Sequence, residues 1–465
     1  MERRGKMKKV IGIMLTAAMI LSLAACGSSS PAPATTAAPA ATEAATTAGP
    51  AATTAAPAET EAAATEAAPE TIKIGVLLPY SGGSAKNGEL ESLGIELYTE
   101  LFNKNGGVKS MGGAQIELVK ADSTSVAEVG ATEFQKLVEV EKVAAVLGPI
   151  NSPVAAVTMP LADRYKIPYL IVNSGSDTLT QEKYQYSFRA NVADCKALGM
   201  YQDFFNYLKD EKGYEVKKLI CVHSNDDWGT GTANVMETVC KEMGIQCDRE
   251  SFSPGTTDFS TIVNKIKAGG YDIVYMSPNG VNEAALFATT MNEYDCHTPT
   301  IGGGGGWIIA EFNEMSHGLG NESFCFVTAF SKDVLDIKPK ANEVADIIYE
   351  RTGNTVQDNT ANGFMDAGIL YEAIEQAGST DADAIVKALE DMDMPSDHMA
   401  LALHPYDSVS FGDYDPGFGY PMMYHENQTS TPSITQILDG EYRLVWPIPE
   451  GFESPIVWPS NPFSD

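Results

Sequence analysis

The chain has 465 residues and a formal net charge of −31, with 31 basic against 62 acidic side chains. This acidic balance disfavours binding to nucleic acid or to anionic lipid surfaces, because both are negatively charged. The length exceeds what one hydrophobic core usually holds, so more than one folded unit is expected.

The first residues predict an export signal. Five basic residues fall within MERRGKMKK (1–9), and an apolar run follows at 10–25. This order is typical of a secretion signal rather than a spanning helix. The run ends in LAACG (23–27), which resembles the lipobox of bacterial lipoproteins. The resemblance implies that residues 1–25 are removed and that lipid on Cys26 anchors the protein outside the bacterial cell membrane; an ordinary signal peptide is the alternative.

Residues 26–70 are predicted to form a disordered tether. After Cys26 they are almost entirely Ala, Thr, Pro, Ser and Glu. A segment without large apolar side chains cannot offset its ordering entropy. A flexible chain of this length spans roughly 35–40 Å root-mean-square. The folded region is therefore expected to begin near Thr71.

From Thr71 onward, strand-like and helix-like patterns alternate. Apolar runs predict strands at 72–79, 116–121, 143–148, 169–173, 219–224, 271–277 and 324–330. Apolar stripes at helical spacing predict helices at 89–103, 196–209, 232–243, 259–268, 282–293, 339–351, 362–376 and 382–391. The alternation predicts an α/β fold of doubly wound parallel sheets, covered by helices on both faces.

Residues 71–465 are too many for one such sheet, so two lobes joined by a hinge are predicted. Ligands of open α/β sheets bind beyond the carboxyl ends of the strands. Two lobes that face each other therefore predict a cleft lined by loops between strands and helices. Hinge closure around a small molecule suits that geometry.

Four stretches carry a family resemblance: IKIGVLLPYSGGSAKNG (72–88), AAVLGPINSPVAA (144–156), IPYLIVNSGSDTLT (167–180) and HSNDDWGTG (223–231). In order and spacing they resemble the type I periplasmic binding proteins, especially the Leu/Ile/Val-binding components of ABC importers. The resemblance implies two α/β lobes joined by three crossovers, with ligand between them. The implied division is 71–191 plus 328–415 for lobe 1 and 192–327 plus 416–465 for lobe 2.

The resemblance also assigns ligand-binding positions on lobe 1. Ser152, in GPINSP, matches a serine that binds ligand carboxylate, and a helix start suits an anion. Simple capping of that helix is the alternative. The loop NSGSD (173–177) resembles one that contacts ligand through its backbone and a hydroxyl. It supplies Ser174, Gly175 and Ser176. Asn87 falls where leucine binders place an aromatic residue, and it could equally be a turn residue.

On lobe 2, Trp228 matches an aromatic residue that lines the cleft. A tryptophan between aspartate and glycine in a loop is hard to explain as a core residue. Asn279, in SPNGV, matches a position that offers a side chain to the ligand, with a turn residue as the alternative. For Asp226 and Asp227, capping of the following helix is the simplest role.

Five consecutive glycines occupy residues 302–306. No GK[ST] ends the run and no GxGxxG is formed, so a phosphate loop is not predicted. In the amino-acid binders that this chain resembles, a carboxylate near this point neutralises the ligand's α-ammonium, whereas this sequence has Gly304. A buried ammonium without a counter-charge is costly. Either another acid such as Asp226 or Asp227 reaches the cleft, or the ligand is an amide, a urea or an aromatic carboxylate.

Six cysteines follow Cys26, and an exported protein permits disulfides between them. Cys240 and Cys247 are close in sequence and form the favoured pair. No Cys/His cluster has zinc spacing, and neither a Ser/His/Asp order nor a nucleotide loop is present. No metal, cofactor, catalytic residue or nucleic-acid partner is therefore expected.

The expected function is that of a monomeric, lipid-anchored binding protein outside the cell membrane. It would capture a small polar metabolite and deliver it to the permease subunits of an ABC importer. The alternative keeps the fold and changes the partner, so that a ligand-sensing domain presents its bound state to a receptor or sensor.

Overall fold

The computed structural model describes residues 71–338, 340–449 and 452–464. The predicted signal peptide (1–25), Cys26 and the tether to residue 70 lie outside the described residues. In the described part of the chain, no helix is both long enough and apolar enough to cross a membrane.

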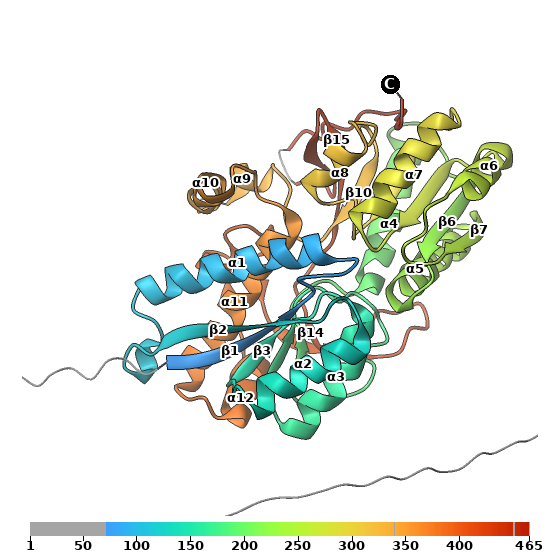
Figure 1. The fold of residues 1–465 in the computed structure, drawn as a ribbon. Coiled ribbons are helices and arrows are strands. Elements are labelled where there is room, and N and C mark those ends of the chain that lie inside the picture. The colour runs from blue at the N-terminus through green and yellow to red at the C-terminus, as the bar shows by residue number, and fades with distance from the viewer. Residues whose placement is uncertain (1–70, 339, 450–451, 465) are drawn as a thin grey trace, which may run out of the picture. The chain divides into compact units, whose positions relative to one another are not determined.

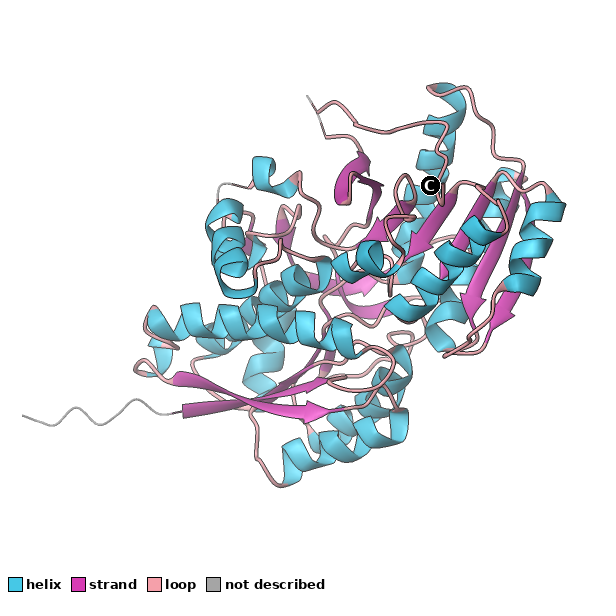
Figure 2. Ribbon diagram, turned by 45° about the horizontal axis from the view of Figure 1, so that its top comes forward, coloured by secondary structure: helices cyan, strands magenta, loops and turns pink. Residues whose placement is uncertain are grey.

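Two seven-stranded sheets, each flanked by helices, make up the described fold (Figures 1 and 2). The first sheet has the order β13-β14-β5-β4-β3-β1-β2. Its strands are β1 (Thr71–Leu78), β2 (Gln115–Asp122), β3 (Ala145–Leu147), β4 (Tyr169–Ile171), β5 (Ser187–Arg189), β13 (Phe411–Tyr414) and β14 (Met423–Asn427). All neighbours in it run parallel except the edge pair β13 and β14.

The second sheet repeats this plan in the order β16-β15-β10-β9-β8-β6-β7. Its strands are β6 (Lys218–Ser224), β7 (Gln246–Phe252), β8 (Ile273–Ser277), β9 (Thr300–Gly303), β10 (Phe324–Val327), β15 (Ser433–Leu438) and β16 (Glu441–Trp446). Strands β6 to β10 are parallel, and β15 and β16 add an antiparallel edge. The predicted two-lobed, doubly wound fold is thereby confirmed.

Helices pack on both sheets and bury their apolar faces. The first lobe has α1 (Ala85–Lys104), α2 (Ala127–Glu139), α3 (Ser152–Tyr165), α9 (Val334–Ile337), α10 (Ala341–Thr352), α11 (Asp358–Ala377) and α12 (Ala382–Glu390). The second lobe has α4 (Ala197–Asp210), α5 (Asp227–Met243), α6 (Ser260–Gly269), α7 (Val281–Glu293) and α8 (Ala310–Met315). Short elements complete the fold: η1 (Lys109–Met111), η2 (Asp194–Lys196), η3 (Met399–Leu401), β11 (Met394–Pro395) and β12 (Ser408–Val409).

The chain passes between the sheets after β5, after β10 and after β14. Strand β14 lies in the first sheet, so the last passage comes after residue 427 and not at the expected boundary of 415–416. The physical reason is a buried ion pair. Arg189 on β5 and Glu426 on β14 are both 0% exposed, and their nearest charged atoms are 2.7 Å apart. A buried guanidinium requires such a partner, and that requirement holds β14 beside β5.

The six described cysteines are free. The expected Cys240–Cys247 disulfide is therefore wrong for this structure. Cys247 lies on β7 next to β6, and its sulfur faces the sulfur of Cys221 at 3.7 Å. Because these thiols are buried or half-buried, they pack in the hydrophobic core or at its edge.

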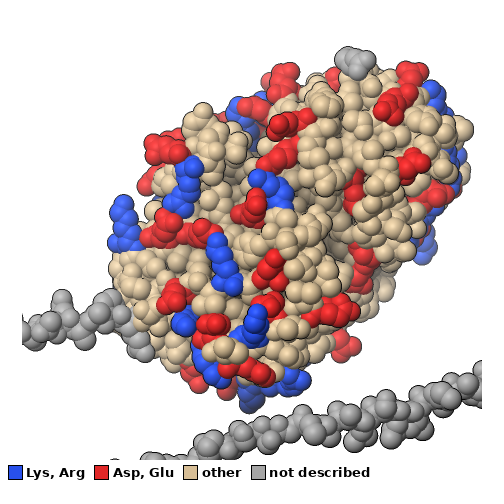
Figure 3. Space-filling model, in the orientation of Figure 1, with Lys and Arg blue, Asp and Glu red and all other residues tan. Residues whose placement is uncertain are grey.

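The face seen in Figure 3 carries acidic and basic side chains interspersed over both lobes, without a broad patch of Lys and Arg. A mixed surface of this kind promotes solubility and gives no strong attraction to polyanions.

Candidate functional site

A cavity of about 730 Å³ is lined by residues of both lobes. Its walls come from the loops that follow β1 to β5 in the first sheet and β6 to β10 in the second. These are the carboxyl ends of the parallel strands, where open α/β sheets bind ligands. The volume lies within the usual range of small-molecule sites.

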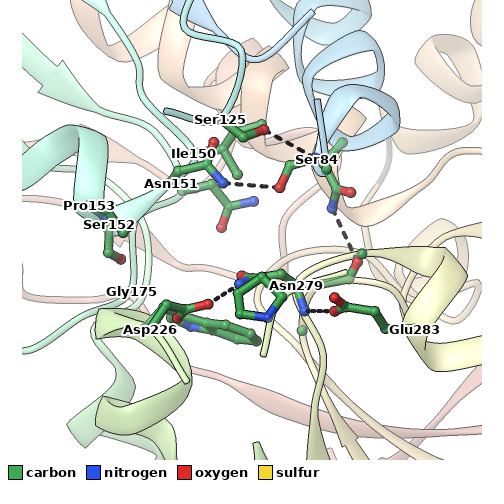
Figure 4. Close-up of a pocket in the computed structure, with 18 of the residues that line it drawn as sticks. Ser84, Ser125, Ile150, Asn151, Ser152, Pro153, Gly175, Asp226, Asn279 and Glu283 are labelled. Atoms are coloured by element: carbon green, nitrogen blue, oxygen red, sulfur yellow. Dashed lines mark hydrogen bonds between the residues drawn. The ribbon is translucent and has the colours of Figure 1, made fainter. Parts of the chain in front are cut away.

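Polar side chains of the first lobe form one wall in a connected network. The backbone N–H of Ser84 donates to Ser125 Oγ over 3.1 Å, and Asn151 Nδ2 donates to Ser84 Oγ over 3.0 Å (Figure 4). Asn87, expected at the site, lines the cavity and donates from Nδ2 to the carbonyl of Gly305 in the second lobe over 3.1 Å. The wall is thus held in place before any solute enters.

Ser152 lies in the cavity wall as the first residue of α3. The N-cap of α3 is Asn151 and not Ser152, so the capping alternative does not describe Ser152. Instead Ser152 Oγ accepts from the N–H of Ser176 over 3.3 Å. The hydroxyl proton therefore remains available for an acceptor in the cavity.

The loop 174–176 brings Gly175 to the cavity wall, whereas Ser174 and Ser176 are not among the lining residues. Ser174 Oγ lies 3.1 Å from the carbonyl oxygen of Pro149 and can donate to it. Ser176 Oγ pairs with Thr178 Oγ1 at 3.0 Å. The buried Arg189 holds this loop from beneath, donating from Nη1 to the carbonyl of Ser176 over 2.8 Å.

Trp228 lines the cavity from the second lobe, but it lies in the first turn of α5 and not in a loop. Its indole covers Gly304, another lining residue. A Cβ added to Gly304 would lie 3.1 Å from Trp228 Cζ2, and the φ of +41° disfavours any side chain there. The tryptophan and the glycine form a pair, because the ring fills the space that an acidic side chain at residue 304 would need.

The remaining glycines of the run serve packing. An added Cβ at Gly302 would lie 2.1 Å from the ring of Trp307, and at Gly305 it would lie 2.0 Å from the carbonyl of Pro278. Backbone and indole therefore approach so closely that only glycine fits. The run is part floor of the cavity and part strand β9.

Four acidic residues line the cavity: Asp194, Asp226, Glu283 and Asp358. Its described lining residues include no Lys, Arg or His. Across the described chain, no cluster of three or more His, Cys, Asp and Glu side chains is arranged to hold a metal ion.

Asp226 caps α5 as expected, since its Oδ1 accepts from the N–H of Gly229 over 2.8 Å. Its Oδ2 accepts from the side chain of Asn279. Asp227 is exposed and is not among the lining residues. The backbone N–H of Asn279 donates to Glu283 over 3.0 Å, so the expected site residue Asn279 lines the cavity between two acids (Figure 4).

Asp194 is the acid that sequence reasoning missed. It is 6% exposed, and its Oδ2 has no hydrogen-bond partner among the described residues. Burial raises the pKa of this carboxyl well above its usual value, and the charge of Asp177 adds to the rise. The charge of Arg189 and the indole of Trp228 oppose it. Asp194 follows β5, a strand of three residues that is too short to stand out as a pattern.

Two facing α/β lobes with a polar cavity at the carboxyl ends of their strands define a solute-binding protein of the two-lobed type. A sequence profile described as periplasmic binding protein matches residues 71–408, and the chain belongs to this family.

Relatives and solved structures agree with that assignment. The Leu/Ile/Val-binding protein homolog 7 of Brucella suis biovar 1 is 25% identical over 398 residues, which cover 82% of this chain and 93% of the relative. The leucine-binding protein LivK of Thermotoga maritima has a TM-score of 0.67 at 20% identity, covering 80% of this chain and 97% of its own. LivJ of Streptococcus pneumoniae, solved with isoleucine, has a TM-score of 0.67 at 22% identity, covering 80% and 98%.

A similar fold occurs with a different ligand. A solute-binding protein of Rhodopseudomonas palustris, solved with benzoate, has a TM-score of 0.67 at 19% identity and covers 81% of this chain and 95% of its own. Likenesses at this level of identity show the fold alone. The ligand of the present chain must therefore be argued from its own cavity.

Proposed function

We propose that this protein is the solute-binding component of an ABC importer and captures a small polar metabolite between its lobes. The observation that carries the proposal is the cavity itself, which is lined by loops from both sheets. Neither lobe alone encloses a solute there. A ligand in this position adds contacts to both halves at once and so favours the closed arrangement.

Contacts across the cavity mouth support this mechanism. Lys86 Nζ on α1 lies 2.8 Å from Glu311 Oε1 on α8, and Asn87 donates to Gly305 over 3.1 Å. A half-buried ion pair and a single hydrogen bond of this kind contribute only a modest free energy each. The closed state therefore depends on the solute for most of its stability, which is what allows release to a permease.

In the bound state, Ser152 would donate its hydroxyl proton to an acceptor on the solute, while the loop 174–176 offers Gly175 and its backbone. Asn87, Asn279 and the ring of Trp228 would contact the solute across the cavity, over the floor at Gly304. The protein would act as a monomer that binds and releases without chemical turnover.

We also propose that the protein works outside the cell membrane, held by lipid on Cys26 and spaced from the membrane by the tether 26–70. Replacement of Cys26 by Ala should abolish labelling by a fatty-acid precursor and release the protein into the soluble fraction. Labelling that persists in this variant would contradict the anchor and leave solute binding untouched.

Solute capture is tested by a thermal-shift screen of amino acids, amides, ureas and carboxylates, followed by small-angle scattering with each hit. A hit should raise the melting temperature and lower the radius of gyration. Deletion of the neighbouring permease gene should then abolish uptake of that solute. Binding with closure but unchanged uptake would point to the sensor alternative, and conversion of a hit to product would point to an enzyme.

A further inference from the structure

We propose that Glu91 on α1 and Asp366 on α11 share one buried proton, and that this acid pair positions the asparagines of the cavity wall. Neither acid is among the residues that line the cavity, so the pair acts on the wall from behind. The inference rests on the proposed function in one respect, because the wall that the pair positions is taken to be the wall of a solute site.

The first observation is that two carboxyl groups meet where water is excluded. Glu91 and Asp366 are both 0% exposed, and their side chains lie within hydrogen-bonding contact of each other. Glu91 Oε1 and both carboxyl oxygens of Asp366 have no hydrogen-bond donor among the described residues. Two ionised carboxyl groups in contact would repel each other, and each buried oxygen without a donor is costly. One proton between Glu91 Oε1 and Asp366 removes the repulsion and supplies the missing donor.

No neighbouring cation takes the place of this proton. The described groups that face the pair are Asp358 and Asn359 of α11, Asn173 after β4, and the hydroxyl of Tyr406. None of these described groups is basic. Burial raises the pKa of both Glu91 and Asp366, and the contact with Glu91 adds to the rise at Asp366. The side-chain amides of Asn359 and Asn173 oppose the rise at Glu91.

The second observation is the hydrogen bonding of the other oxygen of Glu91. Glu91 Oε2 accepts from Asn359 Nδ2 over 3.2 Å and from Asn173 Nδ2 over 3.4 Å. An oxygen that accepts two N–H groups does not carry the proton, which places the proton on the side of Asp366. Both asparagines line the cavity. Glu91 therefore sets which end of each amide group faces the core.

One of these asparagines connects Glu91 with the second lobe. Asn359 Oδ1 accepts from Asn87 Nδ2 over 3.3 Å, and Asn87 Nδ2 also donates to the carbonyl of Gly305 over 3.1 Å. An amide group has its donor at one end and its acceptor at the other, so a reversed Asn359 would meet Asn87 with a second donor. The contact between the lobes at Gly305 thus depends on the orientation that Glu91 sets.

The other asparagine connects Glu91 with the hinge. Asn173 Oδ1 accepts from Asn191 Nδ2 over 3.3 Å, and Asn191 Oδ1 accepts from the N–H of Val192 over 2.8 Å. Val192 lies just after β5, in the first passage of the chain between the sheets. One carboxylate therefore holds two chains of hydrogen bonds, of which one ends in the second lobe and the other in the hinge.

Loss of the shared proton would place two negative charges in contact between α1 and α11. These helices meet backbone to backbone at this level, since an added Cβ at Gly363 would lie 2.1 Å from the carbonyl of Glu91. Repulsion between the carboxylates of Glu91 and Asp366 would act directly on this contact. The asparagines of the wall should therefore move when the proton leaves at alkaline pH.

The experiment follows the side-chain amide signals of the purified full chain by NMR, without solute, after isotope labelling of asparagine nitrogen. The signals of Asn173 and Asn359 are assigned with the variants Asn173→Ser and Asn359→Ser. Both should shift in one common transition between neutral and alkaline pH, above the ordinary range of a carboxyl group. Asp366→Asn puts an N–H donor in place of the shared proton. In this variant both signals should keep the positions that they have in the natural protein at neutral pH, and the transition should be lost.

Two further variants separate positioning from folding. Asp366→Leu has no donor for Glu91 Oε1, so both asparagine signals should already be shifted at neutral pH. Glu91→Gln carries the donor on the other side of the pair and should lose the transition as Asp366→Asn does, which keeps the test decisive if one variant does not fold. The matched control is Asp346→Asn, the same change at an exposed aspartate on α10, and it should keep the transition.

Infrared spectra in heavy water test the proton itself. At neutral pH the natural protein and Asp346→Asn should show the band of a protonated carboxyl group that Asp366→Asn lacks. The inference is overturned if Asp366→Asn keeps this band or the pH transition. It is also overturned if the signals of Asn173 and Asn359 do not shift before the protein unfolds, because a merely structural pair would lower the melting temperature of its variants without such a transition. These measurements use no solute, so their failure leaves the proposed function standing, and a failed solute screen leaves their result unchanged.

Discussion

At the scale of single residues, the second lobe has no acid at residue 304, whereas the first lobe brings the carboxyl group of Asp194 to the cavity. Gly304 cannot present a carboxylate because the ring of Trp228 covers it, 3.1 Å from where a Cβ would stand. Asp194 presents an unpartnered carboxyl oxygen from the other lobe. The ring of Trp228 thus lines the cavity and takes the space that an acidic side chain at residue 304 would need.

Trp228→Ala should weaken binding of the best solute from the screen by about tenfold or more, because a flat aromatic contact is lost. The free energy of unfolding should change by about 1 kcal/mol or less, since the side chain is half-buried and lines the cavity. Calorimetry and urea unfolding measure the two effects.

Trp307→Ala is the matched control. Trp307 is 0% exposed and packs on Phe312, so its removal should cost about 3–5 kcal/mol of stability. If Trp228→Ala destabilised the protein as much as Trp307→Ala does, Trp228 would be a core residue and its role at the site would be refuted.

The free energy of unfolding of the empty protein should depend on pH through Asp194. Burial raises the pKa of Asp194, so the empty protein holds this carboxyl protonated to a higher pH than a free aspartate. A carboxyl with a raised pKa holds its proton in the folded state, so its contribution falls as pH rises from the unfolded value toward the raised one. Urea unfolding at a series of pH values should show this fall in the natural protein and not in Asp194→Asn. Equal pH profiles of the free energy of unfolding for the two proteins would contradict a raised pKa at Asp194.

At the scale of elements, the long helices α1 and α11 set the shape of the first lobe. They pack backbone to backbone at two glycines. An added Cβ at Gly94 would lie 2.1 Å from the carbonyl of Thr360, and one at Gly363 would lie 2.1 Å from the carbonyl of Glu91. The first turn of α1 brings Asn87 to the cavity, and the first turn of α11 brings Asn359 there. The contact between the two helices therefore positions the cavity wall as well as the core of the first lobe.

Gly94→Ala should destabilise the protein by about 2–4 kcal/mol, since the new methyl group forces the two helices apart. Gly199→Ala is the control, because it is a helical glycine on α4 with nothing within 4 Å of an added Cβ. That change should stabilise the protein by about 0.5–1 kcal/mol through helix propensity. Equal effects in urea unfolding would show that helix propensity alone governs Gly94.

At the scale of the whole molecule, two sheets of the same plan present the carboxyl ends of their strands to one cavity. The chain passes between them three times, which gives a hinge of separate segments. Contacts between the lobes at the mouth, such as Lys86 with Glu311 at 2.8 Å, are only half-buried, and a single ion pair of this kind contributes little free energy. A weakly held mouth is consistent with a protein that opens and closes around its solute.

Lys86→Glu should lower solute affinity about two- to fivefold, because it places like charges across the mouth and disfavours closure. The exchange Lys86→Glu with Glu311→Lys should recover most of the loss. Lys136→Glu serves as control, since Lys136 pairs with Glu133 within α2 alone. Failure of the exchange to recover affinity would show that this pair does not act on closure.

The sequence alone determined the fold class, because alternating apolar runs and helical stripes are local patterns. It indicated two lobes. Through four quoted stretches it indicated Asn87, Ser152, Gly175 and Trp228, and through two later segments Asn279 and Gly304; these six line the cavity, whereas the predicted Ser174 and Ser176 do not. It also raised the question of the missing acid at Gly304. These residues can be predicted because each one follows a predicted strand, in a segment that resembles the corresponding segment of the family.

Tertiary packing alone decided which acids line the cavity and which sheet receives β14. Asp194 follows a three-residue strand, and its open oxygen is defined by neighbours that are distant along the chain. Glu426 belongs to the first sheet because Arg189, more than two hundred residues earlier, needs a partner where water is excluded. The burial of a side chain and the identity of its hydrogen-bond or ion-pair partners depend on residues that are distant in sequence. A local sequence pattern therefore cannot predict them.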